Sequence, residues 1–410
     1  TGECLAALAM VDIDNFKDIN DVYGHQIGDK VLTLISQRIA NCLSDGDLIG
    51  RFGGDEICLL LSEVENKGDI QRRLENIQSA IRIPIELECA TISVCASIGV
   101  AVYPDNGHDV EDLFKRVDMA LYLAKQRGRN RCEFYTSELQ DRITKRISIQ
   151  EEARKGLSNG EFTLFYQPIY SVEKQCVESF EALLRWNHPE KGLLTPAQFW
   201  DVFDDLRLTT LIGSYVRAKA IEDAKCWKTN GVEFGKISLN TTSSDFIEPN
   251  FALRLKNKIE ENGLSISDIS IEVTEGMFLG RQASNIREEI RRLHEFGFEI
   301  AFDDFGTGFA SLTHLKELPL DRIKIDRSFI KDIAINETDL KIVSGIVALA
   351  HSLGLAVTAE GIETNNQLEI MKILRIESIQ GYIVSRPISA LEISAKSLEL
   401  ISSVETRQNF

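Results

Sequence analysis

The segment EIAFDDFGTG, residues 299–308, decides the fold, because it is an apolar run that ends in two adjacent aspartates and a glycine-rich turn. Six further apolar runs between Phe180 and Ile383 follow the same plan. At or near their ends they deliver Glu181, Asn240, Glu272, Lys324, Glu360 and Gln380. Strands alternating with helices at this spacing predict a closed parallel barrel, in which the carboxyl ends of the strands converge on one mouth and hold the chemistry.

The predicted barrel has eight strands, which is the number that closes such a fold. They span residues 162–169, 176–186, 236–240, 269–274, 299–303, 322–326, 356–359 and 378–383. Helical periodicity lies between most of them, at 218–227, 253–261, 285–296, 339–353 and 366–374. The carboxyl-terminal part of the chain is therefore predicted to be a TIM-barrel-like α/β domain.

The amino-terminal part shows a different order of elements. Strands are predicted at 5–13, 48–52, 56–61 and 90–103, and helices at 29–43, 70–81 and 110–126. This order favours an α+β domain, an antiparallel-rich sheet with helices on its faces. A polar segment at 137–157 has apolar residues near helical spacing, so we expect a helical connector there. The predicted domains are thus 1–136, the connector 137–157, and 158–410.

Composition excludes several classes of protein. The chain of 410 residues is 43% hydrophobic and carries a formal net charge of -17, which argues against binding a nucleic acid polymer. It contains no run of eighteen uncharged apolar residues, so we expect no membrane segment. Its eight cysteines are scattered, as reduced cytosolic thiols would be. We expect a cytoplasmic protein, or the cytoplasmic part of a longer chain attached to a membrane or a sensor.

The charge at the predicted mouth indicates metal chemistry. Five carboxylates there would repel one another unless cations bind. Adjacent aspartates such as Asp303 and Asp304 can each take a different metal while the first bridges both, although an isolated aspartate at a strand end is more often a helix cap. Two metals would clamp a phosphodiester and convert a bridging water to hydroxide. The pattern therefore predicts a two-metal enzyme that acts on an anionic substrate.

Several blocks of this half resemble the EAL family, cyclic-di-GMP-specific phosphodiesterases with a TIM-like barrel. The blocks are Gln167-Pro168-Ile169, Glu181-Ala182-Leu183-Leu184-Arg185-Trp186, Glu272-Val273-Thr274-Glu275, Asp303-Asp304-Phe305-Gly306, Lys324-Ile325-Asp326, Glu360-Gly361-Ile362-Glu363 and Gln380-Gly381-Tyr382. They occur in order between about residues 162 and 387. The resemblance implies hydrolysis of cyclic di-GMP to linear pGpG.

The resemblance also implies a role for each position. One Mg²⁺ or Mn²⁺ would be held by Glu181, Asn240, Glu272 and Asp303, and a second by Asp303, Asp304 and Glu360. Lys324 would orient or activate the attacking water, with Glu360 as the other candidate for moving the proton and Gln380 in support. Glu275 would anchor the loop 303–311. The nucleotide would be contacted by Gln167, Leu183, Arg185 and Asp326. For Lys324, a plain salt bridge to neighbouring carboxylates remains the alternative.

The amino-terminal half is similar to the GGDEF family of diguanylate cyclases, which resemble nucleotidyl cyclases in fold. Asp12-Ile13-Asp14 ends the first predicted strand and Gly53-Gly54-Asp55-Glu56-Ile57 lies in the predicted hairpin. In isolation, two glycines in a hairpin would be ordinary turn chemistry. Further matching blocks are Ile19-Asn20-Asp21, Gly28-Asp29, Ala124-Lys125 and Gly128-Arg129-Asn130.

This second resemblance implies a GTP site. Asp12, the Ile13 carbonyl and Asp55 would bind Mg²⁺ with GTP, and Asn20 and Asp29 would read guanine. The phosphates and the reacting groups would be met by Gly53, Gly54, Glu56, Lys125 and Arg129. Cyclase turnover would need a homodimer with two facing domains. The chain starts after the family's usual opening segment, which argues against such turnover.

Three readings remain open on the sequence. The first is a phosphodiesterase whose GGDEF domain binds GTP and regulates it. The second is a bifunctional enzyme that also has diguanylate cyclase activity. The third is a catalytically silent receptor for cyclic di-GMP and GTP. The complete set of predicted metal ligands in the barrel favours an active phosphodiesterase over the receptor. The intact set Asp12, Asn20, Asp29, Asp55 and Glu56 favours the bifunctional enzyme.

Overall fold

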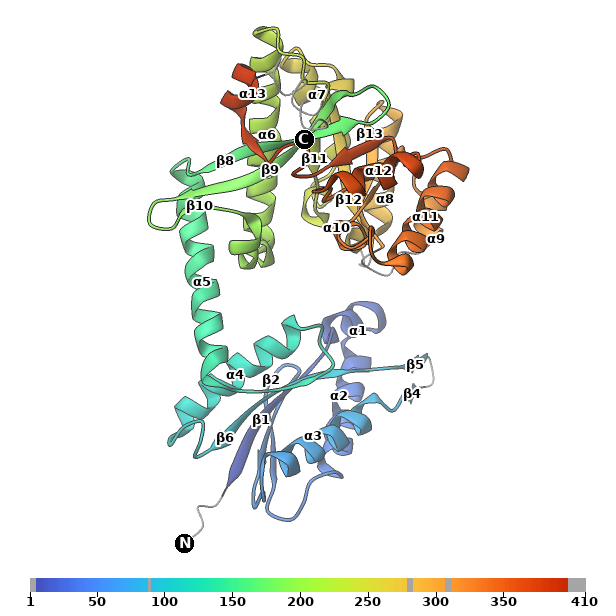
Figure 1. Ribbon diagram of the computed structural model, residues 1–410. Helices are drawn as coiled ribbons and strands as arrows, with labels where there is room; N and C mark the ends of the chain where they lie inside the picture. Colours follow the sequence, from blue (N-terminus) through green and yellow to red (C-terminus); the bar gives the residue numbers. More distant parts are fainter. Residues whose placement is uncertain (1–4, 88–89, 279–282, 307–311, 397–410) are drawn as a thin grey trace. The chain divides into compact units, whose positions relative to one another are not determined.

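A computed structural model describes residues 5–87, 90–278, 283–306 and 312–396 (Figure 1). The chain divides into two compact units, Thr1–Ser148 and Ile149–Phe410. The boundary between them falls within helix α5 (Ser137–Ser158). Among the described helices, none is both long and apolar enough to span a membrane.

The first unit contains seven strands and four helices ahead of α5 in the part that the structure describes. The strands are β1 (Ala6–Ile13), β2 (Leu48–Gly53), β3 (Glu56–Leu61), β4 (Ile85–Leu87), β5 (Ala90–Ile92), β6 (Ala96–Tyr103) and β7 (Cys132–Phe134). The helices are α1 (Phe16–Tyr23), α2 (His25–Ala40), α3 (Lys67–Arg82) and α4 (Val110–Gln126).

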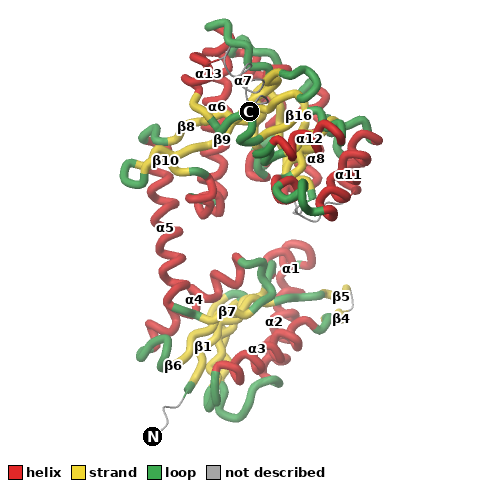
Figure 2. The backbone as a smooth tube through the Cα atoms, in the orientation of Figure 1, coloured by secondary structure: helices red, strands yellow, loops and turns green. Residues whose placement is uncertain are grey.

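Its main sheet has the order β2-β3-β1-β6-β7, and every pair except β6–β7 is antiparallel. The two-residue period of β1 splits its side chains between two cores. Ala7, Ala9 and Val11 pack with α2 and α3, whereas Leu8 and Met10 pack with α4 on the other face. Figure 2 shows these helices, in red, around the yellow strands. An antiparallel-rich sheet with helices on both faces is confirmed.

The second unit contains ten strands in the described residues. They are β8 (Phe162–Ser171), β9 (Cys176–His188), β10 (Gly192–Leu194), β11 (Lys236–Asn240), β12 (Ile269–Thr274), β13 (Glu299–Phe305), β14 (Arg322–Ile325), β15 (Ala356–Ala359), β16 (Ser378–Gln380) and β17 (Ile388–Ser389). Its α-helices after α5 are α6 (Leu206–Thr229), α7 (Phe251–Glu261), α8 (Ala283–Glu295), α9 (Leu312–Glu317), α10 (Arg327–Ile330), α11 (Glu337–Ser352), α12 (Asn365–Ile373) and α13 (Ala390–Lys396). Short 3₁₀ turns are η1 (Pro196–Gln198), η2 (Trp200–Asp204), η3 (Ser243–Phe246), η4 (Ile266–Asp268) and η5 (Glu275–Phe278).

Eight of these strands close a barrel, in the order β8-β9-β11-β12-β13-β14-β15-β16 and back to β8. The seven strands from β9 onward run parallel, but β8 is antiparallel to both of its neighbours. The prediction of an all-parallel barrel is therefore wrong for this strand. Only four residues separate β8 from β9, and a parallel crossover needs a dozen or more. That spacing was already present in the sequence.

Other differences are local. The predicted strand 90–103 is two strands, β5 and β6, which belong to different sheets. The predicted strand 378–383 ends at Gln380, because the chain then turns so that the Ile383 N–H donates to the Ile362 carbonyl at 3.0 Å. Sequence reasoning did not anticipate α1, β4 or β7. The last two are only three residues long, too short to show a hydrophobic period.

Candidate active site

Lys324 lies at the centre of a cluster of carboxylates at the carboxyl ends of the barrel strands. Its Nζ atom is 2.7 Å from Glu360, 2.9 Å from Glu272, 3.2 Å from Asp303 and 3.4 Å from Glu181. The lysine and Glu272 are each only 1% exposed. The four carboxylates come from four different strands or strand ends, β9, β12, β13 and the end of β15. Barrel closure therefore gathers residues that are far apart in the sequence around one ammonium group.

Burial and repulsion set the protonation of this cluster. Burial, reinforced by neighbouring carboxylates, raises the pKa of Glu360 to about 8 and that of Glu272 well above its usual value. Burial acts in the same direction on Glu181, but the Lys324 charge and hydrogen bonds from Gln380 and Asn240 lower its pKa overall. Burial would lower the pKa of Lys324, yet the surrounding carboxylates hold it well above its usual value. Without metal, the lysine therefore holds its proton firmly.

Asp303 and Asp304 both contribute to the mouth although they are consecutive. Neighbouring residues on a regular strand point to opposite faces. Here the pairing of β13 with β14 shifts register between Phe302 and Phe305, and Asp304 adopts a left-handed φ of 53°. As a result, carboxylate oxygens of Asp303, Asp304 and Glu360 lie within 4.8 Å of one another. Burial and the charge of Asp303 raise the pKa of Asp304 to about 6.

A second set of contacts orients Glu181. Asn240 donates its amide to one oxygen of Glu181 at 2.7 Å, and Gln380 donates to the other at 2.6 Å. Gln380 also donates to Gln167 at 3.2 Å. Because β8 pairs with β9 in antiparallel register, Gln167 lies directly opposite Glu181. The structure thus brings Gln167, Asn240 and Gln380 into the same cluster as the carboxylates.

The remaining residues predicted for nucleotide binding lie on β9 and after β14. Arg185 stacks over the Phe165 ring at 5.8 Å, and burial lowers its pKa. Leu183 precedes it by two residues on the same strand and is partly buried. Asp326 caps α10 by accepting from the Ser328 N–H at 2.9 Å. Its charge also acts on Asp304, which places Asp326 near the carboxylate cluster.

Glu275 follows β12 directly and is 5% exposed. Neither of its carboxylate oxygens has a hydrogen-bond partner among the described residues. Most of the loop that it is expected to anchor, residues 307–311, lies outside the described part of the chain. The proposed anchoring role therefore remains a prediction.

The mouth is chemically suited to two divalent cations. Its five carboxylates and one ammonium group leave four negative charges when all are ionised, and two divalent cations would balance these. Oxygen donors are the ligands that Mg²⁺ and Mn²⁺ prefer. The carboxylates whose pKa values are raised would also lose their protons more easily beside a cation.

The first unit brings together part of its predicted GTP site. The period of β1 places Asp12 on the face covered by α4, and Lys125 of α4 donates to the Asp12 carboxylate at 2.6 Å. Ile13 follows at the end of the strand. Asp12 pairs in register with Glu56. Burial, with the negative charges of Asp55 and Glu56, raises the pKa of Asp12 despite the lysine.

The residues predicted to read guanine also lie together. Asn20 on α1 packs against Gly28 on α2, so closely that a Cβ atom at residue 28 would lie 2.0 Å from the Asn20 amide oxygen. Asp29 follows Gly28 directly and is exposed.

Three of the predicted phosphate-binding positions in the first unit are exposed, whereas Lys125 is partly buried. Gly53 ends β2, and the turn between β2 and β3 holds Gly54 with a φ of 50°. Arg129 is exposed in the turn that follows α4. These exposed positions leave room for the phosphates of a nucleotide.

Sequence reasoning missed a second polar layer below the mouth. Arg322, Glu299 and Lys236 form ion pairs inside the barrel, at the amino ends of β14, β13 and β11. The sequence does contain a pattern that could have indicated these residues. On several strands a polar residue stands two or four positions before the mouth residue, as Arg322 does before Lys324. This spacing places both on the inner face of the barrel.

Two family profiles match the chain. The EAL domain profile matches residues 150–387, and the profile of the diguanylate cyclase GGDEF domain matches residues 3–131. The cyclic di-GMP phosphodiesterase NbdA of Pseudomonas aeruginosa is 36% identical over 391 residues, which are 94% of this chain and 49% of that protein. The bifunctional diguanylate cyclase/cyclic di-GMP phosphodiesterase MucR of the same organism is 34% identical over 389 residues, 95% of this chain and 56% of that protein. The chain thus spans about half the length of these curated relatives.

A solved structure is also similar to this chain in its fold. The PaMucR phosphodiesterase in complex with c-di-GMP superposes with a TM-score of 0.56 and 34% sequence identity. The match covers 60% of this chain and 99% of that one.

Proposed function

The chain belongs to the EAL family and carries a GGDEF domain ahead of its EAL domain, and we propose that it hydrolyses cyclic di-GMP to linear pGpG at the mouth of the barrel. One observation carries the proposal. The five carboxylates and Asn240 that the resemblance assigns to two metals, and the Lys324 that it assigns to the attacking water, converge on a single buried cluster. The 36% identity to a protein named as a cyclic di-GMP phosphodiesterase supports the choice of substrate.

The metals would be held by the residues that the resemblance implies. Glu181, Asn240, Glu272 and Asp303 would take one cation, and Asp303, Asp304 and Glu360 the other. When bound, divalent cations lower the pKa of coordinated water and polarise phosphoryl oxygens. The protein supplies the fixed arrangement of donors around them. Glu181 is the clearest example of such a fixed donor, because the side-chain amides of Asn240 and Gln380 each donate a hydrogen bond to one of its two oxygens.

The chain's own groups would then guide the reaction. The oxygen of the attacking water joins the phosphorus of one phosphodiester, the bond to one sugar oxygen breaks, and that oxygen takes up a proton. Lys324 is placed to hold or orient the water, with its ammonium group surrounded by the carboxylates that would bind the metals. Glu360 is the second candidate for moving the proton, because its carboxylate lies 2.7 Å from the Lys324 ammonium group within the same cluster.

Substrate binding is assigned to residues around this cluster. Gln167, Leu183 and Arg185 on β8 and β9, with Asp326 after β14, would contact the nucleotide. Arg185 can grip a phosphate through its planar guanidinium group. Its partial burial makes that contact stronger than one made in open water.

The GGDEF unit is proposed to bind GTP with Mg²⁺ and to regulate the barrel. Asp12, the Ile13 carbonyl and Asp55 would hold the Mg²⁺, and Lys125 would turn from Asp12 to the phosphates. Regulation requires that GTP bind two states of the protein with different affinity. If saturating GTP changed neither the phosphodiesterase rate nor the KM for cyclic di-GMP, the regulatory part of the proposal would be abandoned.

A bifunctional enzyme is the second candidate, because MucR, which carries both activities in its name, is 34% identical. Purified protein is incubated with Mg²⁺ or Mn²⁺ and either cyclic di-GMP or GTP, and the products are separated by chromatography. We expect pGpG from cyclic di-GMP, its loss in Glu181→Ala, and its retention in the matched control Asp55→Ala. Formation of cyclic di-GMP from GTP would establish the bifunctional enzyme. Binding without turnover of either nucleotide would establish a receptor.

A further inference from the structure

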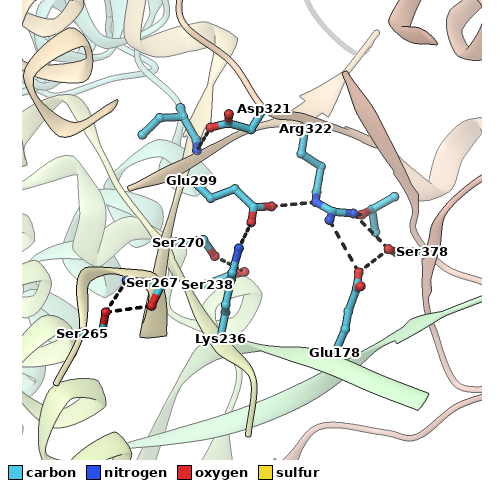
Figure 3. A network of polar contacts seen from close by, with 12 residues as sticks. Glu178, Lys236, Ser238, Ser265, Ser267, Ser270, Glu299, Asp321, Arg322 and Ser378 are labelled. Carbon is cyan, nitrogen blue, oxygen red and sulfur yellow. Dashed lines mark hydrogen bonds and ion pairs between the residues drawn. The ribbon is translucent and has the colours of Figure 1, made fainter. Parts of the chain in front are cut away.

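Arg322 links five strands of the barrel from inside, below the mouth (Figure 3). Its Nε donates to Glu299 on β13 at 2.9 Å, and its Nη1 donates to Ser378 on β16 and to Thr358 on β15, each at 3.0 Å. Its Nη2 lies 3.5 Å from Glu178 on β9. Arg322 itself stands on β14. One guanidinium group therefore holds five strands at once, which only a planar fork with five donors can do.

The same strands carry the groups of the mouth. Arg322 precedes Lys324 by two residues, and each of its partners lies two to four residues before a mouth residue. The pairs are Glu178 with Glu181, Glu299 with Asp303, Thr358 with Glu360, and Ser378 with Gln380. Two more contacts extend the network to the other parallel strands. Lys236 of β11 pairs with Glu299, and Ser238 of β11 shares a 2.8 Å hydrogen bond with Ser270 of β12.

Apolar packing inside the barrel does not fix the distances between strands that face each other across it. Barrels of this type are usually filled by layers of branched apolar side chains. Here a cavity of about 190 Å³ lies between the two polar layers, lined on one side by Glu299 and Arg322 and on the other by Glu272 and Lys324. Close packing therefore cannot hold opposite sides of the barrel in place at this level. Backbone pairing sets the spacing of neighbouring strands, and Arg322 adds contacts from β14 to β16 and β9, which are not its neighbours in the sheet.

We propose that Arg322, together with Glu299, is a positioning residue for the mouth, which fixes how the metal-ligating strand ends stand relative to one another across the barrel. The proposal rests on the proposed function. Buried ion pairs commonly add little net stability compared with apolar residues of similar size. A role in geometry explains why so many polar groups lie inside the barrel.

The test uses Arg322→Lys, which keeps the charge but replaces the five-donor fork with a single ammonium group. Its control is Val347→Ala. Val347 is buried on α11 in the core cluster outside the polar network, so its truncation lowers stability without touching the barrel interior. Thr358→Val is a milder second variant, which removes one acceptor of Arg322 while keeping the side-chain shape. All three are made in the full chain.

Metal-free protein is titrated with Mn²⁺, and free Mn²⁺ is followed by electron paramagnetic resonance. For Arg322→Lys we expect Mn²⁺ affinity to fall about 10- to 100-fold, the range for groups that orient metal ligands. Thr358→Val should show a smaller fall in the same direction. Val347→Ala should keep the wild-type affinity despite a lower Tm. At saturating Mn²⁺, kcat of Arg322→Lys should fall while KM for cyclic di-GMP changes little.

Two results would overturn the proposal. One is an Arg322→Lys affinity within about twofold of wild type, since ligand-orienting groups cost more than that. The other is an equal loss in Val347→Ala, which would reduce the effect to stability. Should Arg322→Lys fail to fold, the Thr358→Val titration decides in the same way. Absence of cyclic di-GMP turnover in the wild type would remove the proposed function, but the Mn²⁺ titration would still decide the positioning role.

Discussion

Lys324 and Glu272 are both 1% exposed, and the Lys324 Nζ atom lies 2.9 Å from a carboxylate oxygen of Glu272 at the mouth of the barrel. A buried ammonium group at this distance offsets part of the repulsion among the surrounding carboxylates. Without metal, the lysine is thus the positive charge that holds the cluster together. This relationship leads directly to the first prediction.

Lys324→Met should destabilise the metal-free protein by about 3–5 kcal/mol, because buried carboxylates lose their partner. Added Mn²⁺ should then raise its Tm more than that of the wild type, since cations replace the missing charge. Turnover should stay lost. Thermal unfolding with and without Mn²⁺ measures this, with Lys228→Met as the control, a lysine half exposed beside Asp268. Equal Mn²⁺ stabilisation of Lys324→Met and wild type would contradict the prediction.

Asp304→Asn should lower the number of Mn²⁺ ions bound at the mouth from two to one. Asp304 is expected to hold only the second metal, whereas Asp303 is expected to contact both. Turnover of cyclic di-GMP should fall by more than about 100-fold, beyond the cost of a group outside the ligand set. Isothermal titration calorimetry gives the stoichiometry.

The matched control for that variant is Asp205→Asn. Asp205 caps α6 in the same unit, and asparagine caps a helix about as well as aspartate. Two bound ions in Asp304→Asn would exclude the assigned ligand role.

Glu299 should make stability depend on pH in a defined direction. Burial acts to raise its pKa, but Arg322 and Lys236 outweigh this and lower it. A lowered folded-state pKa means that Glu299 stabilises the protein above its unfolded-state pKa and ceases to do so as the pH falls through the folded value. Glu299→Gln should therefore be less stable than wild type near pH 7, by about 1.5–3 kcal/mol.

That difference should shrink as the pH falls below the ordinary range for glutamate, about 4. Urea unfolding of both proteins at a series of pH values measures it, and the comparison removes the contribution of all other carboxylates. A difference that stays constant down to acid pH would show that the charge of Glu299 does not contribute.

Gly28→Ala should abolish GTP binding by the first unit and leave the barrel unaffected. A Cβ atom there would meet the Asn20 amide oxygen at 2.0 Å, so Asn20 must move from its place against residue 28. Gly50→Ala is the control, because a Cβ atom at residue 50 meets nothing within 4 Å. A fluorescent GTP analogue reports binding. Equal affinity in both variants would remove Asn20 from the guanine site.

The sequence determined the two-unit fold and the location of the mouth. Both follow from local patterns, the alternation of apolar runs with helical segments and the polar residue at each strand end. The antiparallel course of β8 could also have been inferred, since four residues cannot form a parallel crossover. The three-residue strands β4 and β7 could not be inferred, because they are too short to show a hydrophobic period.

The tertiary structure alone decided which charges touch. Lys324 and Glu181 are 143 residues apart in the chain and meet only because the barrel closes. A register shift and one left-handed residue turn Asp304 toward the mouth. The reach of Arg322 across five strands depends on the same closure. Local sequence sets which face a side chain occupies, whereas distances between strands arise from long-range pairing that no local pattern records.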